Sequence, residues 1–434
     1  MTELAKTANP QTDDTVDRLL DDFDHQSADF ALHWAEVYGK ARANQCPVIH
    51  SDEHGGFDAI LGYDDVVAAF RDWKTFASER LLDENGIEME GGVGIPAHVF
   101  RIGFLEMDPP QSLNLRRLCN PWFNRNTIDA ARPRLSEIMH WAFDNVAEKG
   151  QCDVVTDLVT PFQCVSIMDL LGIPLEKWPR YKEVVDQEVA QEESSLEGMQ
   201  WLLADIFDEI ERQTTEGGHG LLAVLASSEL EGERLDPELV TELILMFLLG
   251  GMDTTIATVG LAVRHLHDTP EDRARLQESP DLIESFVEEV LRFYTPATGM
   301  GRTIRTPTTF ADQCYERGDR VYLAIASANR DERAFDRADE FVIDRSPNPH
   351  MSFGTGTHHC IGSEFARSNT QLFLTTLLSR MPDFEVDVAA AHMVTSIPHA
   401  RSYLTLPISY GPGRSFGSGD HAWPEFKTDP IRPV

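Results

Sequence analysis

The stretch Met351-Ser-Phe-Gly-Thr-Gly-Thr-His-His-Cys-Ile-Gly-Ser-Glu-Phe-Ala-Arg367 decides the fold. Gly354 and Gly356 precede a single cysteine, Cys360, and Gly362 follows just before a predicted helix. Glycine tolerates positive φ and so permits a tight loop. A loop that runs into a helix N-terminus points backbone N–H groups at the sulfur, which favours thiolate over thiol. The stretch therefore predicts a cradle for an anionic sulfur.

Other interpretations of Cys360 compete with this one. A lone cysteine is usually a small buried hydrophobe, and on the residues alone that alternative stays open. Zinc is disfavoured, because the chain has no Cys-x-x-Cys pair and His358 and His359 adjoin the cysteine directly. A dinucleotide loop fails because His359 stands where the third glycine belongs. A thiolate that ligates an iron bringing its own other ligands, as haem does, fits best.

The pattern Phe353-x-x-Gly356-x-x-x-Cys360-x-Gly362 resembles the haem-binding motif of cytochromes P450, in particular of soluble bacterial members. The similarity runs from about Trp34 to about residue 408. It implies a mainly α fold with small β-sheets (α+β), organised as a single large domain with a long central helix over the haem. We expect an acidic flexible segment at 1–30, the catalytic domain at 31–410 and a Gly/Pro-rich tail at 411–434.

Composition narrows the class of protein. An apolar content of 42% in 434 residues is enough for a substantial core. The polar, acidic start of the chain predicts neither a signal peptide nor a membrane anchor, and six scattered cysteines show no disulfide framework, so we expect a cytoplasmic protein. A net charge of -35 argues against nucleic acid and anionic membranes as partners. We expect a monomer.

Residues 236–267 predict one long helix. Asp236 is a suitable N-cap and proline follows at the first helical position. The segment is apolar nearly all round, which predicts that it runs through the core. Glu242 and Asp253 leave no clean apolar span for a membrane.

The middle of this helix has the sequence Gly250-Gly251-Met252-Asp253-Thr254-Thr255. Its two glycines lower the helix propensity, and its charged aspartate is unfavourable in a buried position. The Thr254 hydroxyl can bond the carbonyl of Gly250, and a buried Asp253 needs a partner. One interpretation is a kink with a salt-bridged aspartate. The resemblance implies instead an oxygen-activation site, in which Asp253 and Thr254 manage protons and Leu249 and Gly250 border the substrate.

Glu289 and Arg292 lie at i, i+3 on a predicted helix, which alone is an everyday surface pair. Their place between the long helix and the cysteine loop resembles the Glu-x-x-Arg motif of the P450 family. The resemblance implies a structural network that also contains Arg345, and breaking it should cost several kcal/mol.

The resemblance also implies the residues around the cofactor, haem b, with its iron bound by the Cys360 thiolate. Arg116 is expected to contact one propionate and Arg302 the second, joined by His358, because guanidinium suits a carboxylate. The alternative for Arg116 is a solvent-facing side chain. Ser112 stands where many relatives have a histidine. The loop residues Phe353 and Gly354 border the haem, and Ala297, Thr298, Met300 and Ile397 are expected to line the substrate pocket.

The resulting hypothesis is a haem-thiolate monooxygenase that inserts one oxygen atom of O₂ into a small hydrophobic terpenoid, steroid or aromatic molecule. The chain has no flavin or iron–sulfur domain, so a separate ferredoxin and its NAD(P)H-dependent reductase are expected as electron donors. An H₂O₂-driven peroxygenase and a non-catalytic haem-binding protein are the alternatives. Because acidic ferredoxins would be repelled by the net charge, we expect a local cationic patch, with Arg116, Arg117 and Arg367 as candidates.

Overall fold

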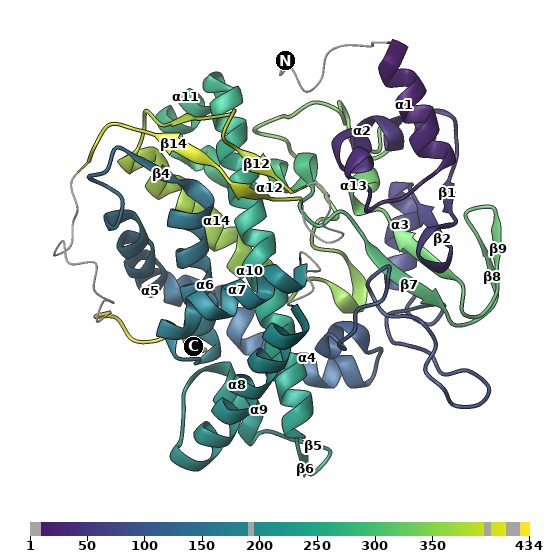
Figure 1. The fold of residues 1–434 in the computed structure, drawn as a ribbon, viewed down its shortest axis with the longest axis horizontal. Helices are drawn as coiled ribbons and strands as arrows, with labels where there is room; N and C mark the ends of the chain where they lie inside the picture. Colours follow the sequence, from purple (N-terminus) through teal and green to yellow (C-terminus); the bar gives the residue numbers. More distant parts are fainter. Residues whose placement is uncertain (1–9, 190–194, 395–400, 414–425) are drawn as a thin grey trace. The chain divides into compact units, whose positions relative to one another are not determined.

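A computed structural model of the chain describes residues 10–189, 195–394, 401–413 and 426–434. The chain divides into two compact units. The first unit contains Met1–Leu113, Glu288–Cys360 and Val394–Arg401, and the second contains Asn114–Val287, Ile361–Met393 and Ser402–Val434. Helices dominate both units and the sheets are small (Figure 1), as the sequence predicts.

The first unit holds three longer helices and one short helix, and the second unit holds eight helices in the described residues. Two more, α4 and α12, begin in one unit and end in the other. The bounds are α1 Pro10–Asp21, α2 Ala28–Ala43, α3 Tyr63–Arg71, α4 Gln111–Phe123, α5 Arg125–Asp144, α6 Thr160–Leu171, α7 Trp178–Val189, α8 Ser195–Glu216, α9 Gly220–Ser227, α10 Pro237–Asp268, α11 Pro270–Glu278, α12 Ile283–Tyr294, α13 Ile325–Ala328 and α14 Ser363–Arg380. Single turns are η2 Glu53–Gly55, η3 Gly103–Glu106, η5 Leu175–Lys177, η6 Pro280–Leu282 and η7 Gly356–His358, and η4 Val154–Val159 is a π-helix.

The largest sheet lies in the first unit and has the strand order β1-β2-β10-β7-β3. Strand β10 pairs parallel to β2 and antiparallel to β7, with Val321 opposite both Asp58 and Arg302. The bounds of its strands are β1 Val48–Ser51, β2 Phe57–Ile60, β3 Phe76–Ala77, β7 Met300–Ile304 and β10 Arg320–Leu323. The remaining strands are β4 Gln151–Asp153, β5 Glu229–Leu230, β6 Glu233–Arg234, β8 Thr308–Phe310, β9 Gln313–Tyr315, β11 Glu385–Val386, β12 His392–Met393, β13 Tyr403–Thr405 and β14 Pro407–Ser409.

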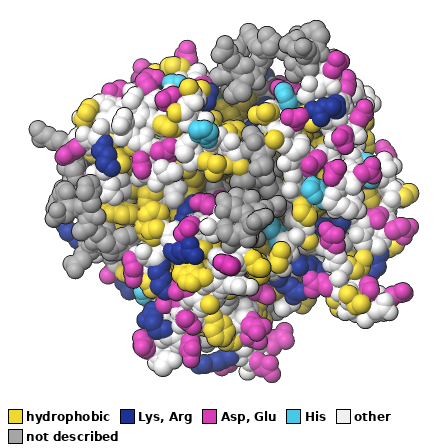
Figure 2. Space-filling model, viewed as in Figure 1, with side chains coloured by type: hydrophobic (Ala, Val, Ile, Leu, Met, Phe, Trp, Pro, Cys, Tyr) yellow, Lys and Arg dark blue, Asp and Glu magenta, His cyan; other side chains and the backbone are white. Residues whose placement is uncertain are grey.

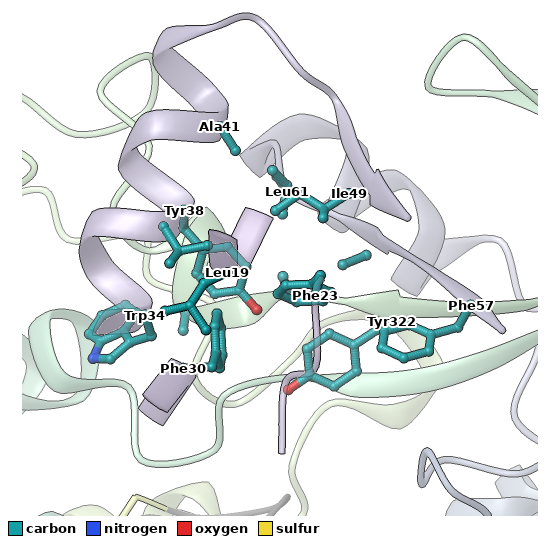
Figure 3. Close-up of a cluster of buried hydrophobic side chains, with 14 of the residues drawn as sticks. Leu19, Phe23, Phe30, Trp34, Tyr38, Ala41, Ile49, Phe57, Leu61 and Tyr322 are labelled. Atoms are coloured by element: carbon teal, nitrogen blue, oxygen red, sulfur yellow. The ribbon is translucent and has the colours of Figure 1, made fainter. Parts of the chain in front are cut away.

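The described part of the segment expected to be flexible over 1–30, residues 10–30, contains helix α1 and the start of α2. Helix α1 packs its apolar side chains against α2 and the sheet, and Val16, Leu19 and Phe23 are at most 4% exposed. Figure 3 shows Leu19 and Phe23 in this cluster beside Phe30 and Tyr38. Val16 and Leu19 lie at i and i+3 on one face of α1, and Phe23 follows after the helix ends at Asp21. The acidic residues around them hide this apolar face in the sequence.

Helix α10 is the core element of the second unit, as its apolar sequence predicts. It packs against α6, α8 and α14 and is continuous from Pro237 to Asp268, with no break at the glycine pair. The side chain of Asp236 accepts a hydrogen bond from the N–H of Glu238, which is the expected N-cap. Two segments of this unit, Val154–Leu171 and Pro237–Asp268, are long and apolar enough to cross a membrane, but both are mostly buried inside the protein, as core helices are.

The described end of the chain, 426–434, packs against α5 and α6. Arg134 of α5 pairs with Asp169 of α6 and stacks over the Phe426 ring, 4.3 Å from its centroid. Asp169 also accepts a 2.9 Å bond from the N–H of Ile431, whose side chain is 2% exposed. These contacts fix the last residues of the tail on the second unit.

Candidate functional site

Cys360 lies in the loop between η7 and α14, and it is exposed and forms no disulfide within the described residues. Its N–H donates a 2.8 Å bond to the carbonyl of Phe353. Gly354 and Gly356 have φ of 61° and 71°, the conformation that the glycine pattern predicts. A Cβ on Gly356 would lie 2.8 Å from the Phe70 carbonyl oxygen, so this turn admits only glycine.

Arg302 of β7 is a buried cation in the same unit. The residue is 2% exposed, and burial lowers the pKa of its guanidinium to about 10, opposed only by the charge of Asp108. It donates a 2.7 Å bond to the Gly301 carbonyl and lies over the Phe70 ring. Among the described residues no carboxylate forms an ion pair with it. A buried guanidinium with so little counter-charge fits an anionic group that the protein chain does not itself provide.

Asp108 lies just before helix α4, which begins at Gln111. Its carboxylate accepts hydrogen bonds from the N–H groups of Ser78 and Glu79 and from Arg305 at 2.5 Å. The His358 ring lies 3.6 Å from it. Burial alone would raise the pKa of Asp108, but these donors outweigh it and hold the pKa below its usual range. Asp108 therefore stays ionised and anchors His358 beside the cysteine loop.

Glu289 and Arg292 form a fully buried pair, each with 0% exposure, and not a surface pair. Arg292 donates two bonds to the Glu289 carboxylate at 2.7 and 2.8 Å, and Arg345 adds bonds at 3.0 and 3.1 Å. The N–H of Val342 and the amide of Asn348 also donate to it. The carboxylate thus holds the chain segment that leads into the cysteine loop.

In the second unit, the centre of α10 is less buried than the helical turns on either side of it, 243–248 and 255–263. Gly250 is exposed and Leu249, Gly251, Asp253 and Thr254 are half-buried, although the helix is otherwise largely core. A Cβ at Gly250 would meet no atom of the described residues within 4 Å. The Thr254 hydroxyl donates a 2.9 Å bond to the Gly250 carbonyl, as expected. The helix therefore presents an uncovered face at its acid and alcohol side chains.

Asp253 has a partner that the sequence did not reveal. The Lys182 ammonium of α7 lies 3.1 Å from Asp253 Oδ1 and also pairs with Asp186. Burial would lower the pKa of Lys182, but the two carboxylates outweigh it and raise the pKa above its ordinary value. The other oxygen of Asp253, Oδ2, is buried and has no hydrogen-bond partner among the described residues. Asp253 is therefore a carboxylate held on one side by a lysine, with one acceptor left over.

The carbonyl of Gly251 is also held from outside the helix. Gln163 of α6, with 0% exposure, donates a 2.6 Å bond to it. Asn369 of α14 donates a 2.9 Å bond to the Gln163 side-chain oxygen, which fixes the orientation of the amide. This chain of amides ties α6 and α14 to the turn of α10 that carries Asp253. No motif in the sequence links these three positions.

The other predicted site residues have mixed surroundings. Arg116 on α4 is half-buried and not fully solvent-facing, and one turn earlier the buried Ser112 hydroxyl has no hydrogen-bond partner in the described part of the chain. Ala297 and Met300 are half-buried, and the Thr298 hydroxyl is 2.8 Å from that of Tyr322. Ile397 lies outside the described residues.

Comparison with known proteins gives the class of this arrangement. The cytochrome P450 family model matches residues 176–410, more than half of the chain. The chain belongs to the cytochrome P450 family. A steroid C26-monooxygenase of Mycolicibacterium smegmatis is 32% identical over 81% of this chain and 86% of that protein. Cytochrome P450 109 of Bacillus spizizenii is 29% identical over 79% of this chain and 83% of that protein.

Solved P450 structures share the fold. The P450 CYP109Q5 from Chondromyces apiculatus has a TM-score of 0.79 and 26% identity, covering 91% of this chain and 100% of that one. The P450 PksS of the Bacillus subtilis bacillaene synthase has a TM-score of 0.80 and 24% identity, covering 89% and 99%. The predicted fold class, mainly α with small β-sheets in the P450 fold, is confirmed.

The protein is therefore a cytochrome P450 monooxygenase, an enzyme that binds haem b through a cysteine thiolate. The described residues suit that cofactor. In the first unit, Cys360 is exposed in a glycine loop, and Arg302 is a buried cation that forms no ion pair with a carboxylate of the described residues. The cofactor and enzyme class predicted from the sequence are thus confirmed at the level of the family.

Proposed function

We propose that this P450 inserts one oxygen atom of O₂ into a steroid or a similarly rigid, apolar polycyclic molecule such as a terpenoid. The proposal for the substrate rests on the steroid C26-monooxygenases of Mycolicibacterium smegmatis and Mycobacterium tuberculosis, which are 32% and 31% identical to this chain. Aromatic molecules, which the sequence analysis also names as substrates, serve as the comparison group when steroids and terpenoids are screened. The single observation that carries the chemistry is the exposed thiol of Cys360 in its glycine loop.

We assign the residues that hold the haem as follows. Cys360 binds the iron, with Phe353 and Gly354 shaping its loop, while Arg302 and Arg116 bind the propionates and His358 supports Arg302. When bound, the thiolate-ligated haem supplies the activation of O₂. The low counter-charge around Arg302 supports its part in this assignment.

Asp253 and Thr254 are proposed to handle protons. The Thr254 hydroxyl donates its hydrogen bond to the Gly250 carbonyl, so the lone pairs of the hydroxyl oxygen remain available to accept another hydrogen bond. One oxygen of Asp253 is held by Lys182, and the other has no partner among the described residues, so the second is available to accept a hydrogen bond. Leu249, Gly250, Ala297, Thr298, Met300 and Ile397 are proposed to border the substrate. Glu289, Arg292 and Arg345 have the structural role of fixing the chain before the cysteine loop.

We propose that a separate ferredoxin and its NAD(P)H-dependent reductase donate the electrons, and that the enzyme is a cytoplasmic monomer. Acidic side chains are spread over the face shown in Figure 2, in keeping with the net charge of -35. An acidic ferredoxin then needs a local cationic surface. Arg117 is exposed and bonded only to Asn114 at 2.9 Å in the described residues, whereas Arg367 is half-buried beside Glu364. Arg117 is therefore a better candidate than Arg367 for a direct contact with the ferredoxin.

The first experiment tests ligation and turnover. The reduced protein under carbon monoxide should show the red-shifted Soret band of thiolate ligation, and Cys360→Ser should lose it. The wild type with a surrogate ferredoxin, its reductase and NADPH should hydroxylate members of a steroid and terpenoid library, detected by mass spectrometry. Turnover with H₂O₂ alone and none with the redox chain would favour the peroxygenase. A thiolate spectrum without any product would favour the non-catalytic haem protein.

The second experiment tests the electron donor. Arg117→Glu should slow reduction by ferredoxin at low salt and leave substrate binding unchanged, because it reverses one charge at the contact surface. Arg125→Glu is the matched control, since Arg125 is also exposed in the second unit. Equal reduction rates for both variants and wild type would remove Arg117 from the proposed surface.

A further inference from the structure

Three potential metal ligands meet in the first unit, on segments far apart in the sequence. Asp24 and His25 lie between α1 and α2, and His54 lies in η2 between β1 and β2. Their ligand atoms all lie within 4.8 Å of one another, and Nε2 of His54 is 3.1 Å from Asp24 Oδ1. Two imidazoles and one carboxylate are a donor set typical of Zn²⁺ and similar divalent ions.

His25 supplies the decisive second observation. Its side chain is in a residue that is only 8% exposed, and its Nδ1 has no hydrogen-bond partner among the described residues. A neutral imidazole carries its proton on one nitrogen and a lone pair on the other, so the tautomer with the proton on Nε2 presents a lone pair at Nδ1. Metal-binding histidines use a ring nitrogen in this form, and their second nitrogen is commonly bonded to a carbonyl or a carboxylate.

Packing holds the His25 ring in place. Its centroid is 5.1 Å from that of Phe57 and 4.6 Å from that of Tyr322, two rings of the apolar cluster drawn in Figure 3. The His54 ring lies 5.7 Å away at an interplanar angle of 80°. The imidazole therefore cannot turn easily toward solvent to satisfy Nδ1 with water.

A simple ion pair between Asp24 and His54 explains only part of this arrangement. It would satisfy those two residues and leave the buried nitrogen of His25 unpaired, which is unfavourable. On the same hairpin, the exposed His50 pairs with Asp58 at 2.7 Å through Nδ1 and with Asp52 at 3.4 Å through Nε2, so both of its ring nitrogens have a partner. The cluster at His25 is thus unlike a routine surface pair.

We propose that Asp24, His25 and His54 bind one divalent transition-metal ion, with Zn²⁺ as the best match. Three protein ligands leave a fourth tetrahedral position for water. A cavity of about 270 Å³ lies beside the cluster, and its charged lining residues are Asp22, Asp24, Asp29 and Glu53 together with Arg18. Arg18 pairs with Asp29 at 2.6 Å, which leaves the other three carboxylates to attract a cation.

The ion would cross-link two segments of the first unit. It joins the segment after α1 to the turn between β1 and β2, which otherwise meet through the apolar cluster and through the bond from the Ser51 hydroxyl to the Phe23 carbonyl. His54 has a positive φ of 52°, a conformation that a bound ligand would help to maintain. The bound ion should therefore protect the N-terminal helix from opening.

The test uses the full chain, loaded with haem and free of any affinity tag, after removal of adventitious metal with a chelator. Isothermal titration with ZnCl₂ should give one tight site per chain, and zinc should raise the melting temperature. His54→Gln and Asp24→Asn should each weaken binding at least about 10-fold and abolish the thermal shift. His50→Gln is the matched control and should behave as the wild type.

Zinc X-ray absorption should show only nitrogen and oxygen ligands at about 2.0–2.2 Å. Sulfur in the coordination shell, or tight binding that persists in both His54→Gln and Asp24→Asn, would overturn the proposal. The proposal would also be overturned if the wild type bound zinc no more tightly than an ordinary surface histidine such as His50 does. Both variants change partly exposed side chains, and their haem spectra verify that they are folded, so the result does not depend on substituting the packed His25.

Discussion

Replacing Glu289 with alanine should destabilise the protein by about 4 kcal/mol, because it removes one half of a buried ion pair. Arg292 has 0% exposure and would keep only its bonds to the carbonyls of Asn329, Ala338 and Glu340. Arg345 would lose both of its bonds to the carboxylate. An unfolding entropy of about 2.1 cal/mol/K per residue gives about 0.9 kcal/mol/K for 434 residues, so the melting temperature should fall by about 4–5 °C.

The same substitution should impair haem retention. Val342, Arg345 and Asn348 are all bonded to Glu289, and they precede the loop that carries Cys360. Releasing them loosens the segment that positions this loop. We therefore expect less haem per chain in the purified variant, measured by the pyridine haemochrome assay.

The matched control is Glu284→Ala on the same helix, because Glu284 is exposed. An exposed substitution should change stability by no more than about 0.5 kcal/mol. Calorimetry of both variants decides the matter. If Glu289→Ala melts within 1 °C of wild type, roughly the control's range, and retains full haem, the reasoning from buried charge is refuted.

Three further predictions follow from the structure. Gln163→Ala should lower the free energy of unfolding in urea by about 2 kcal/mol, because it leaves the buried amide of Asn369 without its acceptor. Gln371→Ala is the control, and equal unfolding midpoints for the two variants would contradict the hydrogen-bond network. A double-mutant cycle of Lys182→Met and Asp253→Asn should give a coupling of about 1–3 kcal/mol, and additive effects would show that the pair contributes nothing. Burial and Arg80 lower the pKa of His98 to about 4, so its contribution to stability is complete above about pH 6.5 and is lost as pH falls toward 4. His98→Gln should therefore flatten the fall in the free energy of unfolding between these pH values, and an unchanged slope would contradict the role of His98.

Local sequence patterns were sufficient where the determining forces act between neighbours in the chain. The N-cap at Asp236 and the apolar run after it predicted α10, and the structure has Pro237–Asp268. The glycines before Cys360 predicted the positive-φ loop. Composition misled at α1, where acidic residues concealed an apolar face that packs in the core.

The partners of the candidate site depend on side chains that are distant in sequence. Lys182 reaches Asp253, Gln163 holds the Gly251 carbonyl, and Asn369 holds Gln163. A buried charge or carbonyl only requires some partner, and many lysines and amides satisfy that requirement in a sequence. Which one is chosen depends on how α6, α7 and α14 pack against α10.

The sequence by itself determined the long helix α10, the cysteine loop and the chemistry of a thiolate-bound haem, because periodicity, capping and glycine conformations are encoded in contiguous residues. Only the tertiary structure decided which buried groups are paired, that Glu289 lies in the core, and that Asp24, His25 and His54 meet. Hydrogen bonds and ion pairs act over a few ångströms of space, and the number of residues between the partners does not limit them.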